Sequence, residues 1–416
     1  MRCTIIAIGS RGDVQPLIAL GVGLKAAGVT VRLATHADFA DAVRAQALEY
    51  FPLEGHAAAF FSGPAGDAFR ETVRRPEQFR RLFDNYLSVF LNRFLADVWD
   101  ACRDADVILS WSRCAPALAE RLRVPVFVVA LNPVLHLPTA AFPNPFQGSD
   151  VSDPATNWRT WRLALPALRI GERQVDEWQQ KALGLPPLRW RRDLRHLRQL
   201  PHLLGYSTAV LPRPDDWPST AHVTGYWFLD ANTDHYQPGD ALRAFLDAGE
   251  PPVAIGFSSQ VGKNAAAITE AVVEAVADAG VRALLITGFG GIKRADFPGN
   301  MLPVATVPYE WMLPRVSALV HHGGAGSTAS ALRFGVPNGA VTFGFDQPLW
   351  GQRIQAIGAG PAPIAASTLT TASLSHMLRE LTTNQALRAG AEAVGRQLRS
   401  EDGIASAVST ILAAVG

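Results

Sequence analysis

Short apolar runs alternate with segments of helical periodicity along most of the chain. Residues Thr4–Ile8 predict a strand buried on both faces, Val14–Ala27 predict a helix, and Val29–Ala34 predict a second strand. A strand, a helix and a strand at this spacing are typical of a β-α-β unit in a parallel sheet. The same alternation recurs at Val107–Leu109, Ala115–Leu122, Val124–Leu131, Val253–Phe257, Ile268–Ala279 and Ala283–Thr287.

Two alternating halves are separated by residues 211–239, which are rich in Pro, Asp and Gly. The chain has 416 residues, which is too long for one ordinary core and suits two domains of roughly 200 residues each. We predict an α/β fold of two doubly wound, Rossmann-like domains that face a cleft. The predicted parts are an N-terminal domain (1–210), a linker (211–240), a C-terminal domain (241–396), and a C-terminal helix (397–416) able to return to the first domain.

Composition narrows the class of protein. Hydrophobic residues make up 48% and charged residues 18%, which indicates a large core, and the net charge of +1 gives no electrostatic reason to expect nucleic acid. Three cysteines without a CxxC pair or metal-ligand spacing favour a reducing compartment, so we expect a cytoplasmic protein. The apolar run before Ser10 is too short for a signal sequence, and no apolar run is long enough to span a membrane.

The stretch from Val320 to Gln347 has the pattern of an anion site. A buried strand is predicted at Val316–Val320, followed by His322, the small turn Gly323–Gly326 and a helix that begins at the cap-type residues Ser327-Thr328. Free N–H groups and the positive end of the helix dipole would point at one spot, and glycines let a phosphate approach the backbone. His322 can add a side-chain donor, and Ser327 a hydroxyl.

Carboxylates are expected at two further strand ends. Asp13 follows the first strand and the loop Gly9–Gly12, at the predicted N-cap of the first helix. It can be a helix cap, a general base at the carboxyl edge of the sheet, or both. Asp346 and Gln347 follow a predicted short strand at Val341–Phe343, where their side chains would project from the ligand edge of the second sheet.

An aromatic run in the first half allows two interpretations. From Phe79 the aromatic and leucine positions recur near helical spacing, which favours a helix packed on the sheet; the alternative is an apolar acceptor pocket. A Pro-rich loop, Pro133–Pro145, can also line the cleft. The tryptophans near residue 160 are expected to pack, and the arginines of 189–198 to form a solvated helix face, with a membrane-surface patch as the minor option. The aromatic run consists of Phe60, Phe61, Phe69, Phe79, Phe83, Tyr86, Phe90 and Phe94.

Four motifs occur in order: GSRGDVQP at Gly9–Pro16, VHHGGAGST at Val320–Thr328, GVP at Gly335–Pro337, and DQ at Asp346-Gln347. Together they resemble the family-1 GT-B glycosyltransferases. Within that family they are most similar to the bacterial antibiotic-aglycone and sterol glycosyltransferases, which carry SRGDVxP near the N-terminus. The resemblance covers residues 1–35 and 239–397.

This resemblance implies inverting transfer of a hexose from a nucleotide-diphosphate sugar to a hydroxyl of an apolar acceptor. The N-terminal domain would hold the acceptor and the C-terminal domain the donor, UDP-glucose or a dTDP-sugar, with no resident cofactor or metal. It implies that Asp13 is the catalytic base. The implied donor contacts lie on both domains. From the first domain, Ser10 and Gly12 would lie beside the diphosphate or sugar. From the second, Ser259 would contact the donor from a strand end, and the base would be held by Pro308, Tyr309 and Trp311. The diphosphate would be held by His322, Gly324, Gly326 and Ser327, and the sugar hydroxyls by Asp346 and Gln347.

Three departures from the family pattern concern the nucleoside. Thr306 stands where plant relatives stack the base on a tryptophan, Pro308–Trp311 replaces the PHDW of the sterol branch, and Ser330 replaces a ribose-binding glutamate. Base recognition would then fall to Val307–Tyr309 and Trp311, which leaves UDP and dTDP both open.

Two other functions fit the architecture. A sugar-nucleotide 2-epimerase shares the two-domain arrangement, but it needs further acid and base carboxylates around the sugar, and the sequence shows no clear set of them. A non-catalytic glycosyltransferase-like binding subunit would be expected to carry a damaged base or diphosphate motif, whereas both motifs are intact here.

Overall fold

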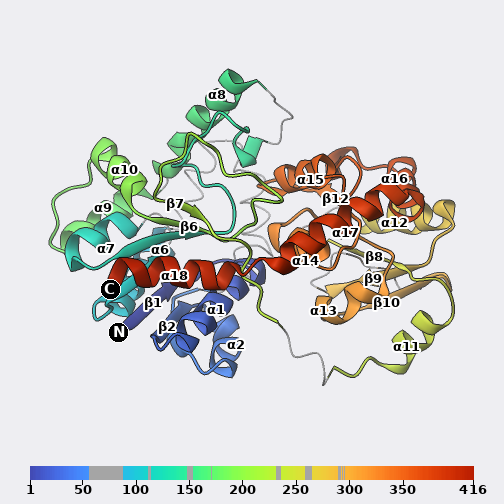
Figure 1. The fold of residues 1–416 in the computed structure, drawn as a ribbon, viewed down its shortest axis with the longest axis horizontal. Coiled ribbons are helices and arrows are strands. Elements are labelled where there is room, and N and C mark those ends of the chain that lie inside the picture. The colour runs from blue at the N-terminus through green and yellow to red at the C-terminus, as the bar shows by residue number, and fades with distance from the viewer. Residues whose placement is uncertain are drawn as a thin grey trace.

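The computed structural model describes residues 1–55, 88–110, 114–147, 153–169, 171–230, 236–257, 265–288, 292, 294 and 296–416. They form two α/β units side by side, each built on one sheet (Figure 1). Every strand pairing described in the two sheets is parallel, which confirms the predicted fold class.

The first sheet has the strand order β3-β2-β1-β4-β5-β6-β7. Its strands are β1 (Arg2–Ile6), β2 (Thr30–Thr35), β3 (Glu49–Pro52), β4 (Val107–Ser110), β5 (Val126–Ala130), β6 (His202–Leu204) and β7 (Ala221–Val223). Its helices are α1 (Arg11–Ala26), α2 (Ala40–Ala45), α6 (Ser88–Cys102), α7 (Ala115–Leu122), α8 (Pro154–Ala164), α9 (Glu172–Lys181) and α10 (Trp190–Gln199).

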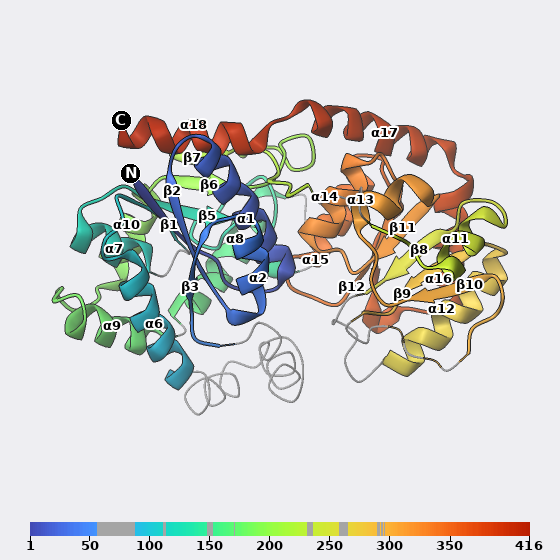
Figure 2. The same cartoon turned by 90° about the horizontal axis from the view of Figure 1, so that it is seen from below.

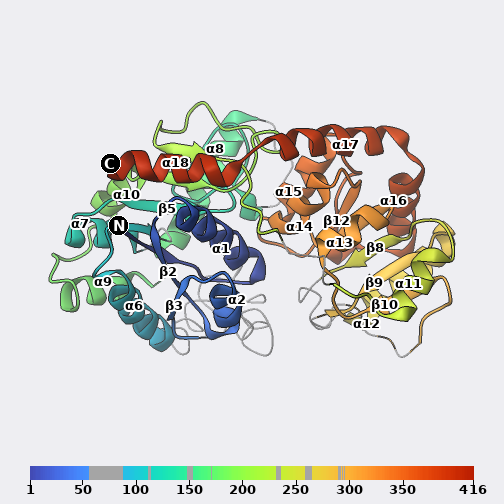
Figure 3. The same cartoon turned by 60° about the horizontal axis from the view of Figure 1, so that its bottom comes forward.

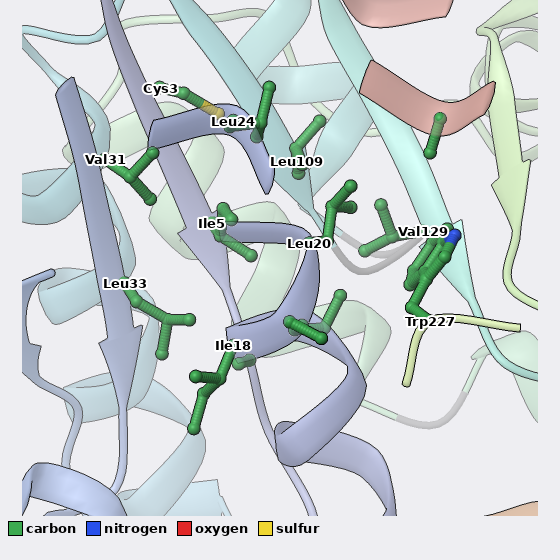
Figure 4. Close-up of a cluster of buried hydrophobic side chains, with 14 of the residues drawn as sticks. Cys3, Ile5, Ile18, Leu20, Leu24, Val31, Leu33, Leu109, Val129 and Trp227 are labelled. Atoms are coloured by element: carbon green, nitrogen blue, oxygen red, sulfur yellow. The ribbon is translucent and has the colours of Figure 1, made fainter. Parts of the chain in front are cut away.

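One part of the predicted linker belongs to the first domain. β7 pairs with β6 in parallel, so residues 221–223 complete the first sheet instead of connecting the domains. Trp227 packs in the same core as α1 (Figure 4). A three-residue strand among Pro and Asp residues is too short to produce a periodic signal, which is why the linker was predicted to begin too early.

Helices cover both faces of the first sheet. On one face Leu20 and Leu24 of α1 pack against Ile5 and Val31 of the strands, as Figure 4 shows. On the other face the core contains residues of α6, α7, α9 and α10. The strands are therefore buried on both sides, which is the condition that their continuous apolar runs predicted.

The second sheet repeats the plan with the order β10-β9-β8-β11-β12-β13. Its strands are β8 (Val253–Gly256), β9 (Ala283–Ile286), β10 (Met301–Val304), β11 (Ala318–His321), β12 (Asn338–Thr342) and β13 (Ile364–Ala365). Its helices are α11 (Asp240–Asp247), α12 (Ala265–Ala279), α13 (Tyr309–Met312), α14 (Ala325–Arg333), α15 (Gln347–Ala356) and α16 (Thr371–Thr383).

Both sheets reverse their winding at an equivalent place. The order changes direction between β1 and β4 in the first sheet and between β8 and β11 in the second. In doubly wound sheets ligands bind outside the carboxyl ends of the strands at this point. The loop at Gly9–Asp13 follows β1, and the turn at His322–Gly324 follows β11, so both motifs lie at switch points.

Two C-terminal helices run across both domains. α17 (Gln385–Ser400) packs against α14 of the second domain, and α18 (Gly403–Val415) packs against α1 of the first (Figures 2 and 3). Where the chain crosses, Gly403 lies directly on the backbone of Gly225 and Tyr226. Within the described residues, none of the helices has the length and apolar character that crossing a bilayer requires.

The substitution Gly403→Ala is predicted to lower the free energy of unfolding by about 1–3 kcal/mol, because a forced contact in a packed interior costs that much. An added Cβ would lie 2.5 Å from the carbonyl oxygen of Tyr226, and backbone cannot rotate away. Urea unfolding followed by circular dichroism measures the change. Gly299→Ala is the matched control, since no atom lies within 4 Å of its added Cβ. Equal losses in the two variants would contradict the prediction.

Candidate active site

Asp13 lies in the first turn of α1, and its carboxylate closes the start of that helix. Ser10 is the N-cap and Asp13 the third helical residue, so the prediction that Asp13 itself is the cap was wrong by three positions. Asp13 Oδ2 accepts hydrogen bonds from the backbone N–H of Ser10 (2.7 Å) and from its hydroxyl (2.8 Å). A carboxylate at this position can satisfy the N-cap from inside the helix, which a sequence search for the cap itself does not reveal.

The glycine before the helix makes room for that carboxylate. Gly9 has φ +118°, a conformation that favours glycine, and a Cβ there would lie 2.5 Å from Asp13 Oδ2. The Asp13 side chain therefore folds back over the Gly9 backbone. Ser10 and Gly12 are exposed on the same turn, as the predicted donor contacts require.

A second carboxylate, that of Asp346 in the other domain, acts electrostatically on Asp13. Asp346 is the N-cap of α15, and its Oδ2 accepts hydrogen bonds from Trp350 Nε1 (2.9 Å) and from Asn132 Nδ2 of the first domain (3.3 Å). Burial raises the pKa of Asp13 above its ordinary value of 3.8, the bonds from Ser10 oppose this, and the charge of Asp346 raises the pKa further. Burial also raises the pKa of Asp346, against the hydrogen bonds that it accepts.

The turn after β11 presents the start of a helix to the same space. Gly324 is the N-cap and α14 begins at Ala325, so Ser327 lies in the first turn and is not the cap that the sequence predicted. The first backbone bond of this helix joins Thr328 N–H to the Gly324 carbonyl at 3.0 Å. The N–H groups of Ala325, Gly326 and Ser327 precede it, and such groups have no acceptor within their own helix, which makes an anion site.

The two adjacent histidines have different surroundings. Buried His321 accepts the Gly323 N–H at Nδ1 (3.0 Å), and its Nε2 lies 3.0 Å from Asn338 Oδ1, so it holds the turn in place. His322 is only partly buried, and a Cβ on Gly324 would collide with its Nε2. Burial, with a smaller contribution from His321, lowers the pKa of His322 to about 3. His322 is therefore neutral at ordinary pH and can donate one N–H bond.

Tyr309 joins the helix end, whereas Trp311 does not. The phenol of Tyr309 forms a hydrogen bond with the Ser327 side chain and interacts electrostatically with Arg11 of the first domain. Burial raises the pKa of Tyr309, and both of these interactions lower it. Trp311 instead stacks edge-on against Tyr236 (centroids 5.2 Å apart) and lies 4.4 Å below the Arg315 guanidinium. The contact of Trp311 with the donor stays a prediction, and in the structure its ring is engaged by Tyr236 and Arg315.

The remaining predicted donor contacts are placed as follows. Pro308 is the N-cap of α13, beside Tyr309. Gln347 is buried, and its Oε1 accepts the backbone N–H of Phe343 (2.6 Å), so its side chain closes the loop before α15. In that loop Phe345 has φ +56°, strained for a non-glycine residue and common next to functional sites. Ser259 lies outside the described residues.

Most of the aromatic run also lies outside the described residues. The exception with a described side chain is Phe94, which is buried in the core under the sheet, as the packing interpretation predicted. In the Pro-rich loop Phe142 packs against Trp161 and Trp217. His136, predicted to be a polar loop residue, is buried with its Nε2 2.8 Å from that of His202, because β6 brings the second ring beneath the loop.

Three contacts at the site were missed by the sequence analysis. Trp350 donates to Asp346, Asn132 reaches Asp346 from the end of β5, and Arg11 lies close enough to Tyr309 to affect it. The contact between Trp350 and Asp346 could have been predicted, because residues four apart on a helix share a face. The other two contacts join different domains, and nothing in their local sequence marks them.

Two domain models match this chain. Residues 3–137 match the glycosyltransferase family 28 N-terminal domain, and residues 291–413 match the C-terminal domain of erythromycin biosynthesis protein CIII-like proteins. The first range lies within the first unit and contains Asp13; the second covers most of the second unit with the α14 turn and continues into α18.

Relatives extend the match to the whole chain. A sterol 3-beta-glucosyltransferase of Yarrowia lipolytica is 35% identical over 99% of this chain and 28% of its own length. One of Arabidopsis thaliana is 30% identical over 98% of this chain and 67% of its own length. The chain thus spans less than a third of the fungal relative and about two thirds of the plant one.

A solved structure shows the same arrangement of domains. The glycosyltransferase of kitacinnamycin superposes with a TM-score of 0.73 at 19% identity, over 100% of this chain and 99% of the other. The switch-point site, the two domain models and the relatives agree. The chain belongs to the glycosyltransferase family that includes the sterol 3-beta-glucosyltransferases, and it has the GT-B fold.

Proposed function

We propose that this protein is an inverting glycosyltransferase that moves a hexose from a nucleotide-diphosphate sugar to a hydroxyl of an apolar, sterol-like or natural-product acceptor. The observations that carry the proposal are that α1, which holds Asp13, packs against α14 of the second domain, and that the charge of Asp346 in that domain acts on Asp13. A base on one side and an anion site on the other are what direct displacement at a sugar carbon requires.

In the proposed reaction Asp13 accepts the proton of the acceptor hydroxyl. The acceptor oxygen forms a bond to the anomeric carbon from the face opposite the diphosphate, and the bond from that carbon to the diphosphate oxygen breaks. The electron pair leaves with the diphosphate. One displacement of this kind inverts the anomeric centre.

The leaving group is proposed to rest on the start of α14. The N–H groups of the first turn, the Ser327 hydroxyl and a neutral His322 are donors that stand in place before the reaction starts. Preorganised donors of this kind stabilise charge where it develops and cost no reorganisation. Asp346 is proposed to accept hydrogen bonds from sugar hydroxyls, because Trp350 and Asn132 fix its carboxylate at the domain boundary.

The identity of the donor and acceptor follows the relatives, whose names describe glucosyl transfer to a sterol 3β-hydroxyl. We propose UDP-glucose or a dTDP-sugar as donor and a small apolar hydroxylated acceptor. The relatives and the N-terminal domain model are glycosyltransferases by description, so the epimerase and binding-subunit alternatives have no support. Three free, buried cysteines support a cytoplasmic location.

Asp13→Asn tests the base. The amide keeps a similar shape and an oxygen that can accept from Ser10, but it cannot take a proton, so kcat should fall about 100-fold or more with little change in thermal unfolding. Turnover is measured by mass spectrometry with UDP-glucose and dTDP-glucose over a panel of sterols and polyketide aglycones. Asp41→Asn, fully exposed on α2, is the matched control. Near-wild-type turnover by Asp13→Asn would remove Asp13 from the role of base.

The pH dependence tests the pairing of the two carboxylates. The base must be ionised and its pKa lies above the ordinary value, so kcat/KM should fall as the pH drops through that raised pKa. Asp346→Asn removes a neighbouring negative charge, lowers the pKa of Asp13, and should move the acidic limb of the kcat/KM profile to lower pH. The position of the limb is the readout, because the rate itself also falls. An unmoved limb would show that the two carboxylates do not interact.

Gly324→Ala tests the contact between the turn and His322. The added Cβ displaces the imidazole, so the Kd for the nucleoside diphosphate should rise about tenfold, the loss of one charge-assisted hydrogen bond. In a His322→Ala background the same change should cost little, since the displaced ring is already gone. Isothermal titration with UDP and dTDP measures all four proteins. Equal, additive losses would mean that Gly324 acts independently of His322.

A further inference from the structure

The helix α8 is attached to the first domain by one face. Trp161 Nε1 donates to the Phe142 carbonyl (2.9 Å) and Asn157 Nδ2 donates to the Ala140 carbonyl (2.9 Å). Both side chains are buried, as is Thr160. These bonds fasten α8 to the Pro-rich loop and fix which side chains point outward.

The outward face of α8 combines large apolar side chains with arginines. Trp158 is 40% exposed and Leu163 is 64% exposed, among the largest exposures of apolar side chains in the described part of the chain. Arg159 and Arg162 are exposed on the same helix. At 100° per residue the order across the outward half is Trp158, Arg162, Arg159 and Leu163. The sequence predicted that the tryptophans here would pack, which holds for Trp161 and fails for Trp158 because only one helix face meets the loop.

The charge on this face is positive, and the described residues place no ion-pair partner on it. In the described ranges neither Arg159 nor Arg162 forms an ion pair, whereas nearby Arg169 is paired with Glu172 at 2.6 Å. The acidic Asp153 lies at the N-cap end, where its carboxylate accepts the Thr156 N–H at 2.8 Å. No acidic side chain of α8 itself therefore stands between the two arginines.

The patch lies close to the proposed acceptor side of the site. Phe146, 48% exposed, belongs to the short 3-10 turn Pro145–Gln147, which packs against α15. The N-cap of α15 is Asp346. Figure 1 shows α8 projecting from the first domain near α15. A surface that contacts α8 and Phe146 would therefore sit beside the site between the domains.

We propose that the outer face of α8, together with Phe146, docks on the surface of an anionic lipid bilayer. Trp favours the membrane interface, Leu and Phe enter the acyl boundary, and arginine stems lie along apolar surface while their charges meet lipid phosphates. Charge complementarity selects an anionic bilayer, because a neutral one leaves both guanidinium groups without a counter-charge. The docking itself does not depend on the proposed function. Delivery of an acceptor from the bilayer to the site rests on the proposed function.

Vesicle flotation tests the docking. The wild-type chain should float with phosphatidylcholine vesicles that contain phosphatidylglycerol, more weakly with phosphatidylcholine alone, and less at high salt. Arg159→Gln with Arg162→Gln should lower the partition coefficient about tenfold and remove most of the salt dependence. Trp158→Ser with Leu163→Ser should lower it about tenfold on both vesicle types.

The matched control changes the same charge elsewhere. Arg44→Gln with Arg243→Gln alters one exposed arginine in each domain and should float like the wild-type chain. Absence of wild-type flotation, or an equal loss in this control, would overturn the proposal. So would concentration-dependent dimers in sedimentation velocity that the α8 variants abolish without any vesicle binding, since the patch would then fit a second copy.

Activity separates this proposal from the proposed function. With acceptor in cyclodextrin both α8 double variants should turn over at the wild-type rate, and with acceptor embedded in anionic vesicles they should be about tenfold slower. If no protein transfers sugar to any acceptor in either form, the proposed function fails while the flotation result still stands. Equal rates on embedded acceptor would contradict delivery from the bilayer.

Discussion

The site depends on two partly buried carboxylates, Asp13 and Asp346, that face each other from different domains. Burial raises the pKa of both carboxyl groups, and the charge of Asp346 raises the pKa of Asp13 further, whereas hydrogen bonds from Ser10 to Asp13, and from Trp350 and Asn132 to Asp346, lower the pKa of the carboxyl group that accepts them. A raised pKa is typical of a carboxyl group that takes up a proton, which is the role proposed for Asp13. Part of each shift comes from the other domain, because Asp346 acts on Asp13 and Asn132 donates to Asp346.

The facing arrangement is produced by contacts around the domain boundary. Trp350 of α15 is fully buried, lies with its ring edge-on to Tyr206 of the first domain (centroids 6.0 Å apart), and also donates to Asp346. Arg353 on the same helix donates to the carbonyl of Val210 (2.7 Å). One helix thus holds the Asp346 carboxylate and docks the two domains, so a shift of the domains would be transmitted to that carboxylate.

The C-terminal chain adds a second connection. α17 packs on the C-terminal end of α14, whose first turn holds Ser327, and α18 packs on the C-terminal half of α1, whose first turn holds Asp13. Between them, Ser207 donates to Glu401 at 2.7 Å and Gly403 lies on Gly225. One continuous segment, α17 and α18, therefore packs against both α14 and α1.

Local sequence determined the parallel sheets, the presence of a helix after each glycine turn, and Asp13, His322, Ser327 and Asp346 as candidates. Apolar periodicity and glycine turns extend over a few residues, whereas the exact helix starts, at Arg11 and Ala325, were not determined. The tertiary structure decided which of two adjacent histidines holds the turn and which is displayed, that Trp311 packs against Tyr236, that Trp158 is exposed while Trp161 is buried, and that Asn132 meets Asp346. Each of these outcomes depends on contacts with residues that are distant in the sequence. Neighbouring residues carry no information about such contacts, since burial and hydrogen-bond partners are set by the docking of whole elements.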